Sequence, residues 1–214
     1  MQQDWLLRMI GQLSSFVAGI KKLRANKEWQ EVHVQIGEGI GRFAGLNASL
    51  VHAISEDDLI QLLSTRGGVD LDRWWALAEL LREEGLALDE QNDAVGADRA
   101  LSKSLRLYLE VLTEAEEVPS YLNVTDLEDV VSRMMDRDLS RSTRIALVDY
   151  LVSTGRYDSA ENVVLWALDS PDPGAPGDAQ SFYQSLRRKS DDQLITGGLS
   201  RAEVESGLAA LVTE

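Results

Sequence analysis

Apolar residues that recur every three or four positions run along almost the whole chain, and no other feature restricts its folding as strongly. In the first segment the residues with this spacing are Leu6, Met9, Ile10, Leu13, Phe16, Val17, Ile20 and Leu23. Because an α-helix turns once in about 3.6 residues, these side chains share one helix face. No segment alternates with the period of two that predicts a half-buried strand. The sequence therefore predicts an all-α fold of about eleven helices.

Polar residues that can cap a helix mark where several of these helices begin. A side-chain oxygen at the residue before a helix accepts a hydrogen bond from a first-turn N–H that has no partner in the helix. By this criterion the predicted caps are Ser55, Asp70, Thr125, Ser140 and Ser200. Glu203, three residues after Ser200, completes a capping box.

One stretch has the composition of a linker. Residues 171–177, Pro-Asp-Pro-Gly-Ala-Pro-Gly, hold three of the four prolines in the chain. Proline lacks the N–H that continues a helix or a sheet. We therefore expect a single domain over residues 1–214, with 171–177 as an internal linker before a helical C-terminal tail.

A pattern of helix, short turn and second helix recurs along the chain. Gly155-Arg156-Tyr157-Asp158-Ser159-Ala160, followed by Ala167, resembles the second half of a tetratricopeptide repeat. Gly85 and Ala97 have the glycine-to-alanine separation of that motif, and a more divergent copy surrounds Val32. Successive copies lie 65 and 63 residues apart, about twice the repeat length of 34. The resemblance implies a right-handed stack of antiparallel helix pairs, with Ala160 and Ala167 buried where paired helices meet.

Three longer stretches are also distinctive. They are the opening Asp4-Trp5-Leu6-Leu7-Arg8-Met9-Ile10, the central Ala78-Glu79-Leu80-Leu81-Arg82-Glu83-Glu84-Gly85, and the tail residues Phe182-Tyr183 with Gly197-Gly198-Leu199-Ser200-Arg201-Ala202-Glu203-Val204. Together they resemble a family of bacterial tetratricopeptide-like proteins known only as a domain of unknown function. The resemblance spans nearly the full length. It implies an architecture and carries over no catalytic residue, because the family has none assigned.

The charge balance limits the classes of partner and location. The chain has 36 acidic and 21 basic residues, a formal net charge of −15. Such a chain repels phosphate backbones, so we expect no nucleic-acid partner. The first 45 residues carry +2 and the remainder −17. Asp4 and Arg8 interrupt the N-terminal apolar run, so we expect neither a secretory signal nor a membrane span, and a cytoplasmic location.

No residue pattern indicates catalysis, a metal or a cofactor. Cysteine is absent from the sequence, which excludes disulfides and thiol chemistry. The two histidines, His33 and His52, lack a zinc-ligand spacing. The run from Gly37 to Gly41 lacks the last glycine of a dinucleotide loop, and we expect Gly37 and Gly41 to admit a neighbouring backbone instead. We expect no cofactor and no enzyme activity, with an enzyme whose site is unrecognised as an alternative.

The repeat register predicts a binding groove. The side chains that it places on the concave face are basic at the N-terminal end and acidic beyond it: Lys21, Arg24, Glu79, Arg82, Asp89, Glu90 and Asp149. We expect a protein–protein interaction module or scaffold that binds a protein or peptide there. The adjacent Trp74 and Trp75 either both pack between helices or divide, with one reaching an edge or a partner.

The first helix raises two alternatives. Its apolar stripe is wide for an exposed terminal helix, so a self-associating structural protein is the second hypothesis, as a homodimer with Trp5, Leu6 and Ile10 in the interface. A helix lying on a membrane surface, anchored by Trp5, Phe16, Lys21, Lys22 and Arg24, is a third. That helix carries few charges on its polar face, unlike strong membrane binders.

Overall fold

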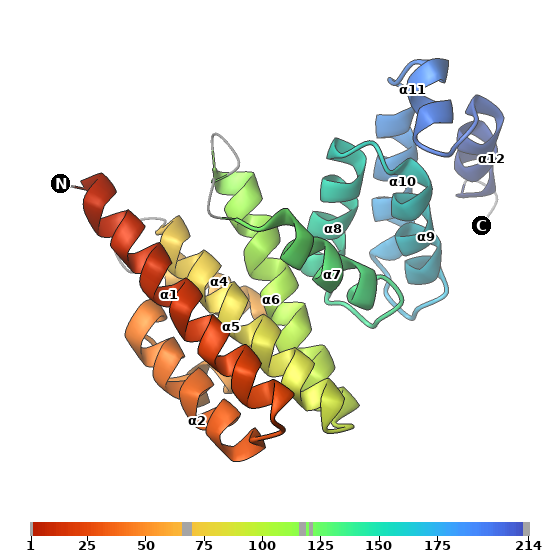
Figure 1. The fold of residues 1–214 in the computed structure, drawn as a ribbon. Helices are drawn as coiled ribbons and strands as arrows, with labels where there is room; N and C mark the ends of the chain where they lie inside the picture. Colours follow the sequence, from red (N-terminus) through yellow and green to blue (C-terminus); the bar gives the residue numbers. More distant parts are fainter. Residues whose placement is uncertain (1, 66–69, 116–118, 120–121, 212–214) are drawn as a thin grey trace. The chain divides into compact units, whose positions relative to one another are not determined.

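The computed structural model describes residues 2–65, 70–115, 119 and 122–211, with the side chains of residues 8–64 in the first of these ranges. In this part of the chain every regular element is a helix (Figure 1), so the all-α prediction is confirmed. The chain forms two compact units, unit 1 over Met1–Arg137 and unit 2 over Asp138–Glu214. The expectation of one domain with a linker at 171–177 did not include this boundary.

Unit 1 consists of two long helix hairpins joined by short helices. The first hairpin is α1 (Gln2–Ala25) with α2 (Trp29–Gly39), and the second is α5 (Leu71–Glu90) with α6 (Ala94–Glu114). Between them lie the π-helical turn η1 (Ile40–Ala44), α3 (Ala48–Ala53) and α4 (Glu56–Thr65), and α7 (Val124–Met134) follows α6. The predicted end of the second helix near Gly45 holds, although its last turn is π-helical and closes at Gly45 with φ 64°.

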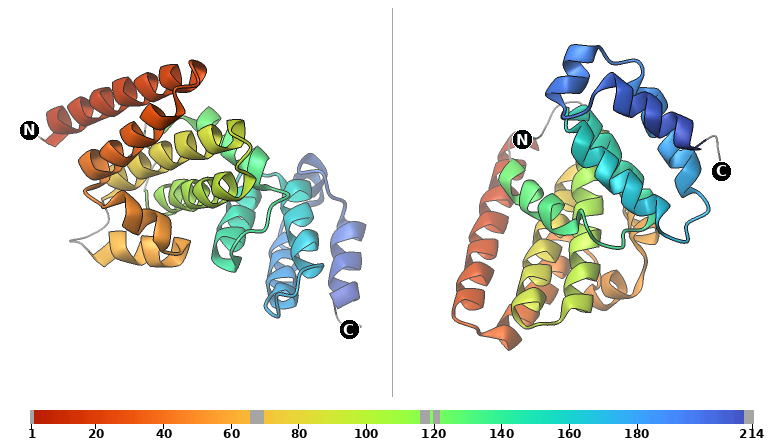
Figure 2. Two further views of the ribbon diagram at one scale, coloured as in Figure 1. Left: turned by 90° about the horizontal axis from the view of Figure 1, so that it is seen from below. Right: turned by 90° about the vertical axis from the view of Figure 1, so that its right-hand side faces the viewer.

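Helix α5 is the centre of unit 1, between the first hairpin and α6 (Figure 2). Its residues are buried without interruption from Trp74 to Ala87. The exposed fractions of Trp74 and Trp75 are 2% and 4%, so both pack between helices and the alternative in which one reaches an edge is wrong. A helix that is buried on all faces must also bury its charged residues, and buried charges need partners of opposite charge.

Two glycines bring the neighbouring helices close to α5. A Cβ on Gly85 would lie 2.5 Å from Leu101 Cγ on α6, and a Cβ on Gly39 would lie 2.9 Å from Leu80 Cδ2. The predicted close approach at Gly37 and Gly41 is wrong, because a Cβ at either would make an ordinary contact at 3.9 Å. Gly39 lies on a different face of the same turn from these two, and that face meets α1 and α5.

Unit 2 consists of helices of which the first three pack in chain order. The helices of this unit are α8 (Arg141–Ser153), α9 (Tyr157–Leu168), α10 (Ala175–Leu186), α11 (Asp191–Thr196) and α12 (Arg201–Leu211). Helix α9 contacts α8 and α10, and α12 contacts α10. Ala160 and Ala167 are 0% and 3% exposed, so their predicted burial is confirmed.

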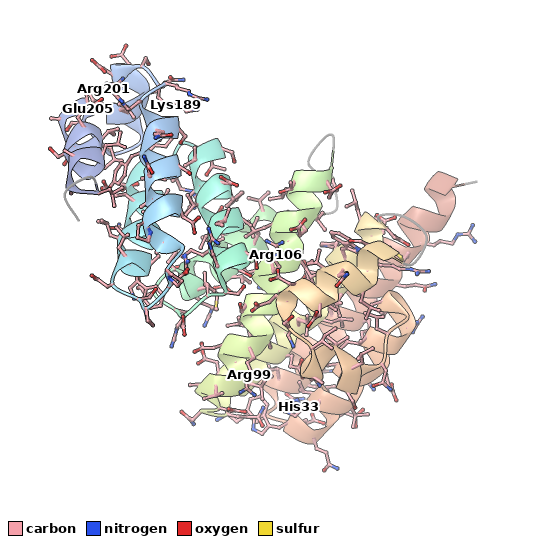
Figure 3. The ribbon with its side chains drawn as sticks, turned by 180° about the vertical axis from the view of Figure 1, so that it is seen from behind. His33, Arg99, Arg106, Lys189, Arg201 and Glu205 are labelled. Atoms are coloured by element: carbon pink, nitrogen blue, oxygen red, sulfur yellow. The ribbon has the colours of Figure 1, made fainter. Side chains whose placement is uncertain are left out.

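Backbone groups fix the short C-terminal helices to the rest of unit 2. The Asp158 N–H donates to the Gly197 carbonyl over 3.0 Å, which joins the start of α9 to the end of α11. Arg201, at the start of α12, donates to the carbonyls of Arg187 and Lys189 just beyond α10; Figure 3 labels Arg201 and Lys189. Helix α12 is therefore held at its first turn.

Most of the predicted helix starts are confirmed. The side chains of Asp70 and Ser140 accept first-turn N–H groups, as do those of Ser55 and Ser200. Glu203 accepts from the Ser200 N–H over 2.7 Å and completes the predicted capping box. The prediction of Thr125 is wrong, because Asn123 caps α7 and its Oδ1 accepts from the Thr125 N–H over 3.1 Å. Asparagine is the stronger N-cap of the two residue types.

The proline-rich stretch is only partly a linker. Helix α10 begins at Ala175, so residues 175–177 form its first turn, including Pro176. Proline is tolerated there because a first-turn N–H has no acceptor within the helix. The connection between α9 and α10 is residues 169–174, which include only the first four residues of the predicted linker.

The burial of Ala160 leads to a stability prediction. We expect Ala160→Leu to lower the free energy of unfolding by about 1–3 kcal/mol, because the added atoms have no space between α8 and α9. Asn162→Leu is the matched control, an exposed position on the same helix where a change within about 0.5 kcal/mol is expected. Urea unfolding followed by circular dichroism measures both, and equal midpoints would contradict the packing described.

Candidate functional site

Six of the seven predicted groove residues lie in unit 1, where they take part in a network that joins α1, α5 and α7. Arg24 on α1 contacts Glu90 on α5 over 3.3 Å. Arg82 on α5 contacts Asp126 on α7 over 2.5 Å, and Asp89 on α5 contacts Arg133 over 3.3 Å. The remaining predicted members are Lys21 and Glu79. We call the set Lys21, Arg24, Glu79, Arg82, Glu83 and Asp126 the α5 charge cluster.

Glu83, which the sequence analysis did not single out, is the centre of this cluster. Its side chain is fully buried and lies 2.8 Å from Arg24 Nη1, 2.7 Å from Arg82 Nη1 and 3.6 Å from Lys21 Nζ. Burial raises the pKa of Glu83, while Arg24, Arg82 and Lys21 act in the opposite direction. The sequence did contain a signal for the burial of Glu83. Apolar residues occur on all faces of this helix, so a charged residue in its middle is expected to be buried and paired. The cluster is thus paired internally and holds α1 against α5.

A cavity of about 210 Å³ lies beside the cluster and is lined by Lys21, Glu79, Asn123 and Asp126 together with apolar residues of α1. Burial raises the pKa of Glu79, while the nearby Tyr108, Arg82 and Lys21 act in the opposite direction. The pKa of Tyr108, which is fully buried, lies well above its ordinary value for the same reason and because the Glu79 carboxylate is close. Glu79 lines this cavity, whereas Tyr108 is buried next to Glu79 and is not a lining residue.

The two histidines lie in separate polar contacts. His33 Nε2 is 3.1 Å from Gln91 Nε2, and His52 Nε2 is 3.0 Å from Glu84 Oε2. The hydrogen bond to Glu84 raises the pKa of His52. Lys103 lies nearby and donates to the Val51 and His52 carbonyls at the end of α3, and burial lowers its pKa. The contacts of His52 with Glu84 and of Lys103 with the two carbonyls tie α3 to α5 and α6.

Asp149, the seventh predicted groove residue, lies in unit 2 and does line a groove. The groove has a volume of about 250 Å³ and is formed by α8, α9 and α10. Its apolar lining is Ile145, Val148, Val152, Val164, Ala167, Ala175, Ala179 and Phe182. The alanines keep it open, because larger side chains on α9 and α10 would fill the space between these helices.

The charged residues of the groove differ in how they are paired. Asp178 on α10 is held by Arg141, whose Nε and Nη2 donate to the two carboxylate oxygens over 2.9 and 2.8 Å, and Arg144 pairs with Asp172. Asp149 lies on α8, the helix that carries both arginines, and no cation pairs with it in the part of unit 2 that the structure describes. Partial burial raises the pKa of Asp149. The groove therefore offers an apolar floor and one carboxylate whose charge is poorly compensated.

The sequence analysis named Asp149 as a groove residue and Ala167 as a buried one, and it missed the apolar residues of the groove. Ile145 is 39% exposed, unusually high for an isoleucine, and Val148 is half-buried one turn further along α8. The available signal was a second apolar stripe on α8, since Leu147 and Leu151 already supply the buried face.

The predicted dimer residues all belong to α1. Ile10 is half-buried, and the side chains of Trp5 and Leu6 lie outside the described residues. Self-association through these residues stays a prediction.

Comparison with known proteins gives one match. A family model, described as a family of unknown function (DUF6483), matches residues 1–214. The chain matches no curated protein and no solved structure. None of the helices described is both long and apolar enough to cross a membrane. Within the same residues, no three side chains of the metal-ligating types come together.

Proposed function

The chain belongs to DUF6483, a family of unknown function, over its whole length, and we propose that it is a protein-interaction module that binds a peptide segment in the groove of α8, α9 and α10. The observation that carries the proposal is an apolar groove with the uncompensated carboxylate of Asp149 at its edge.

The size of the groove favours side chains as ligands. Pockets for cofactors and drug-sized molecules have volumes of about 300–1,000 Å³, and this groove has about 250 Å³. That volume suits one large apolar anchor residue with part of its neighbour, the kind of contact that supplies most of the free energy in peptide recognition. A helical or extended segment of a partner protein would present such an anchor.

Charge selects among such segments. A lysine or arginine next to the apolar anchor would pair with Asp149, whose carboxylate has no cationic partner in the described part of unit 2. Unit 2 as a whole contains seven basic and twelve acidic residues, which also favours a basic partner. The proposed ligand is therefore a segment in which a large apolar residue lies beside a basic one.

The architecture that we propose for unit 2 is tetratricopeptide-like. The support is the motif around Ala160 and Ala167, both buried, and the order in which α8, α9 and α10 pack. In such stacks the first helices of successive pairs line the concave face. Helices α8 and α10 hold those places here, and they supply most of the groove lining.

Selection from a peptide library tests the proposal. We expect peptides selected by phage display on the wild-type protein to share a large apolar residue next to Lys or Arg. The double variant Ile145→Ser and Val148→Ser should bind a selected peptide at least about tenfold more weakly in fluorescence anisotropy. Asp149→Asn should weaken only the peptides with a basic residue.

The control is Leu165→Ser on α9. Leu165 is 45% exposed, close to the 39% of Ile145, and does not line the groove. The Leu165→Ser variant should bind the selected peptides with the affinity of the wild type. Selected peptides that bind the double variant as tightly as the wild type would contradict the assignment of the groove.

The cavity beside the α5 charge cluster is the specific observation behind the alternative of an enzyme. Carboxylates with a raised pKa in a cavity are candidates for general acids, and Glu79 has that property. We favour binding, because burial is the largest cause of the raised pKa of Glu79 and the cluster beside it has a clear structural role in joining α1 to α5.

A further inference from the structure

A second cavity in unit 1 has a lining unlike the rest of this acidic chain. Its volume is about 500 Å³, and its lining residues are Arg8, Met9, Gln12, Arg42, Phe43, Gly45 and Arg73. Three of these seven are arginines and none is acidic, although acidic residues outnumber basic ones by 36 to 21 in the chain. We propose that this arginine cavity binds a small phosphomonoester that carries an apolar group.

The three arginines come from three different elements. Arg8 lies on α1, Arg42 on η1 and Arg73 on α5, so the fold and not a local run of sequence brings them together. Like charges repel, and a cavity lined by one sign of charge concentrates counter-ions of the other sign. An anion in the cavity would be attracted to all three guanidinium groups.

Arg42 is held in place before any ligand binds. One of its terminal nitrogens donates to Gln12 Oε1 over 3.3 Å, and its guanidinium carbon lies 5.0 Å from the centre of the Phe43 ring. Arg73 is held by Asp70, whose carboxylate lies 3.0 Å from Arg73 Nε. A guanidinium that is already fixed loses less conformational entropy when it binds, and its fork of donors matches phosphate oxygens in pairs.

The remaining lining residues define the other half of the ligand. Met9 and Phe43 form an apolar wall next to the arginines. Gly45, with φ 64°, ends η1 without placing a side chain in the cavity. A volume of about 500 Å³ is in the usual range for small-molecule sites, and it exceeds what phosphate alone would occupy. The ligand therefore needs an apolar group as well as a phosphate.

Calorimetric titration at constant ionic strength tests the proposal, with phenyl phosphate as the probe and inorganic phosphate as its comparison. We expect phenyl phosphate to bind, and to bind more tightly than inorganic phosphate, because only its ring contacts Met9 and Phe43. Arg42→Gln and Arg73→Gln should each weaken binding roughly tenfold or more, since a hydrogen bond to a charged group is at stake. Arg42→Lys should fall between Arg42→Gln and the wild type.

Arg137→Gln is the matched control. Arg137 is also in unit 1 and has a similar environment to Arg73, since their side chains are 49% and 48% exposed and each pairs with one aspartate. This variant should bind phenyl phosphate as the wild type does. Melting curves without ligand show whether each variant is folded. If Arg42→Gln does not fold, Arg73→Gln, which changes a half-exposed side chain, tests the proposal by itself.

A lipid headgroup has the same chemistry as a free phosphomonoester, and sedimentation with phosphatidic acid vesicles distinguishes the two sources. Wild-type protein that pellets with these vesicles while Arg73→Gln does not would identify the ligand as a lipid headgroup. Binding of phenyl phosphate without pelleting would identify it as a free metabolite. No binding of phenyl phosphate at millimolar concentration, or equal binding by Arg42→Gln, Arg73→Gln and the wild type, would overturn the proposal. These outcomes for phenyl phosphate and vesicles are independent of peptide binding in the groove of unit 2.

Discussion

Glu83→Ala should lower the free energy of unfolding of unit 1 by about 3–5 kcal/mol, because it leaves the guanidinium groups of Arg24 and Arg82 next to an empty, buried site. Breaking one side of a buried ion pair costs far more than the pair contributes. Arg24 would keep Glu90 and Arg82 would keep Asp126, but both would lose the buried carboxylate that lies between them. Urea unfolding followed by tryptophan fluorescence measures the change, as α5 carries Trp74 and Trp75 close to the site.

Glu90→Ala provides the control for this experiment. Glu90 also contacts Arg24, over 3.3 Å, but its side chain is 49% exposed. Exposed ion pairs contribute about 0–1 kcal/mol, so the variant should unfold close to the wild type. Equal effects of Glu83→Ala and Glu90→Ala would show that Glu83 is not buried among the arginines as described.

Trp74→Ala should destabilise the protein by about 3–5 kcal/mol, the cost of removing a large aromatic side chain from a packed core. Trp75→Ala should have an effect of the same size, because both indoles are almost completely buried. Urea unfolding followed by circular dichroism is the appropriate measurement, since the substitutions remove the fluorescent groups themselves.

Trp166→Ala is the comparison for the tryptophans. Trp166 on α9 is 37% exposed, so truncation leaves a smaller cavity and a smaller loss is expected. If Trp75→Ala were as mild as Trp166→Ala, Trp75 would be reaching an edge of unit 1 after all.

The sequence predicted the helices well because its signals are local. The period of the apolar residues and the capping serines and aspartates each act within one turn, so a single segment contains all the information needed. The failures at Thr125 and Pro176 have the same origin, since both place the start of a helix two or three residues too late. The π-helical turn after Gly39 could not be predicted, because contacts with Phe16 and Leu80 from other helices act on it.

The candidate sites were predicted less well, because they depend on which helices meet. The repeat register assigned charged residues of α1 and α5 to one groove, and several of them contact one another. The register could not show that Glu83 lies between Arg24 and Arg82. Arg8, Arg42 and Arg73 are separated by more than thirty residues from one to the next, and no sequence pattern relates them.

The order in which the helices pack has a consequence for how the protein folds during synthesis. Hairpins such as α5 with α6 and α8 with α9 join neighbours in sequence, so their contacts close short loops and form quickly. The slower event in unit 1 is the docking of the first hairpin on α5, because the Arg24–Glu83 pair spans 59 residues. That docking needs nothing beyond residue 137, so unit 1 can fold while the later helices of unit 2 are still being synthesised.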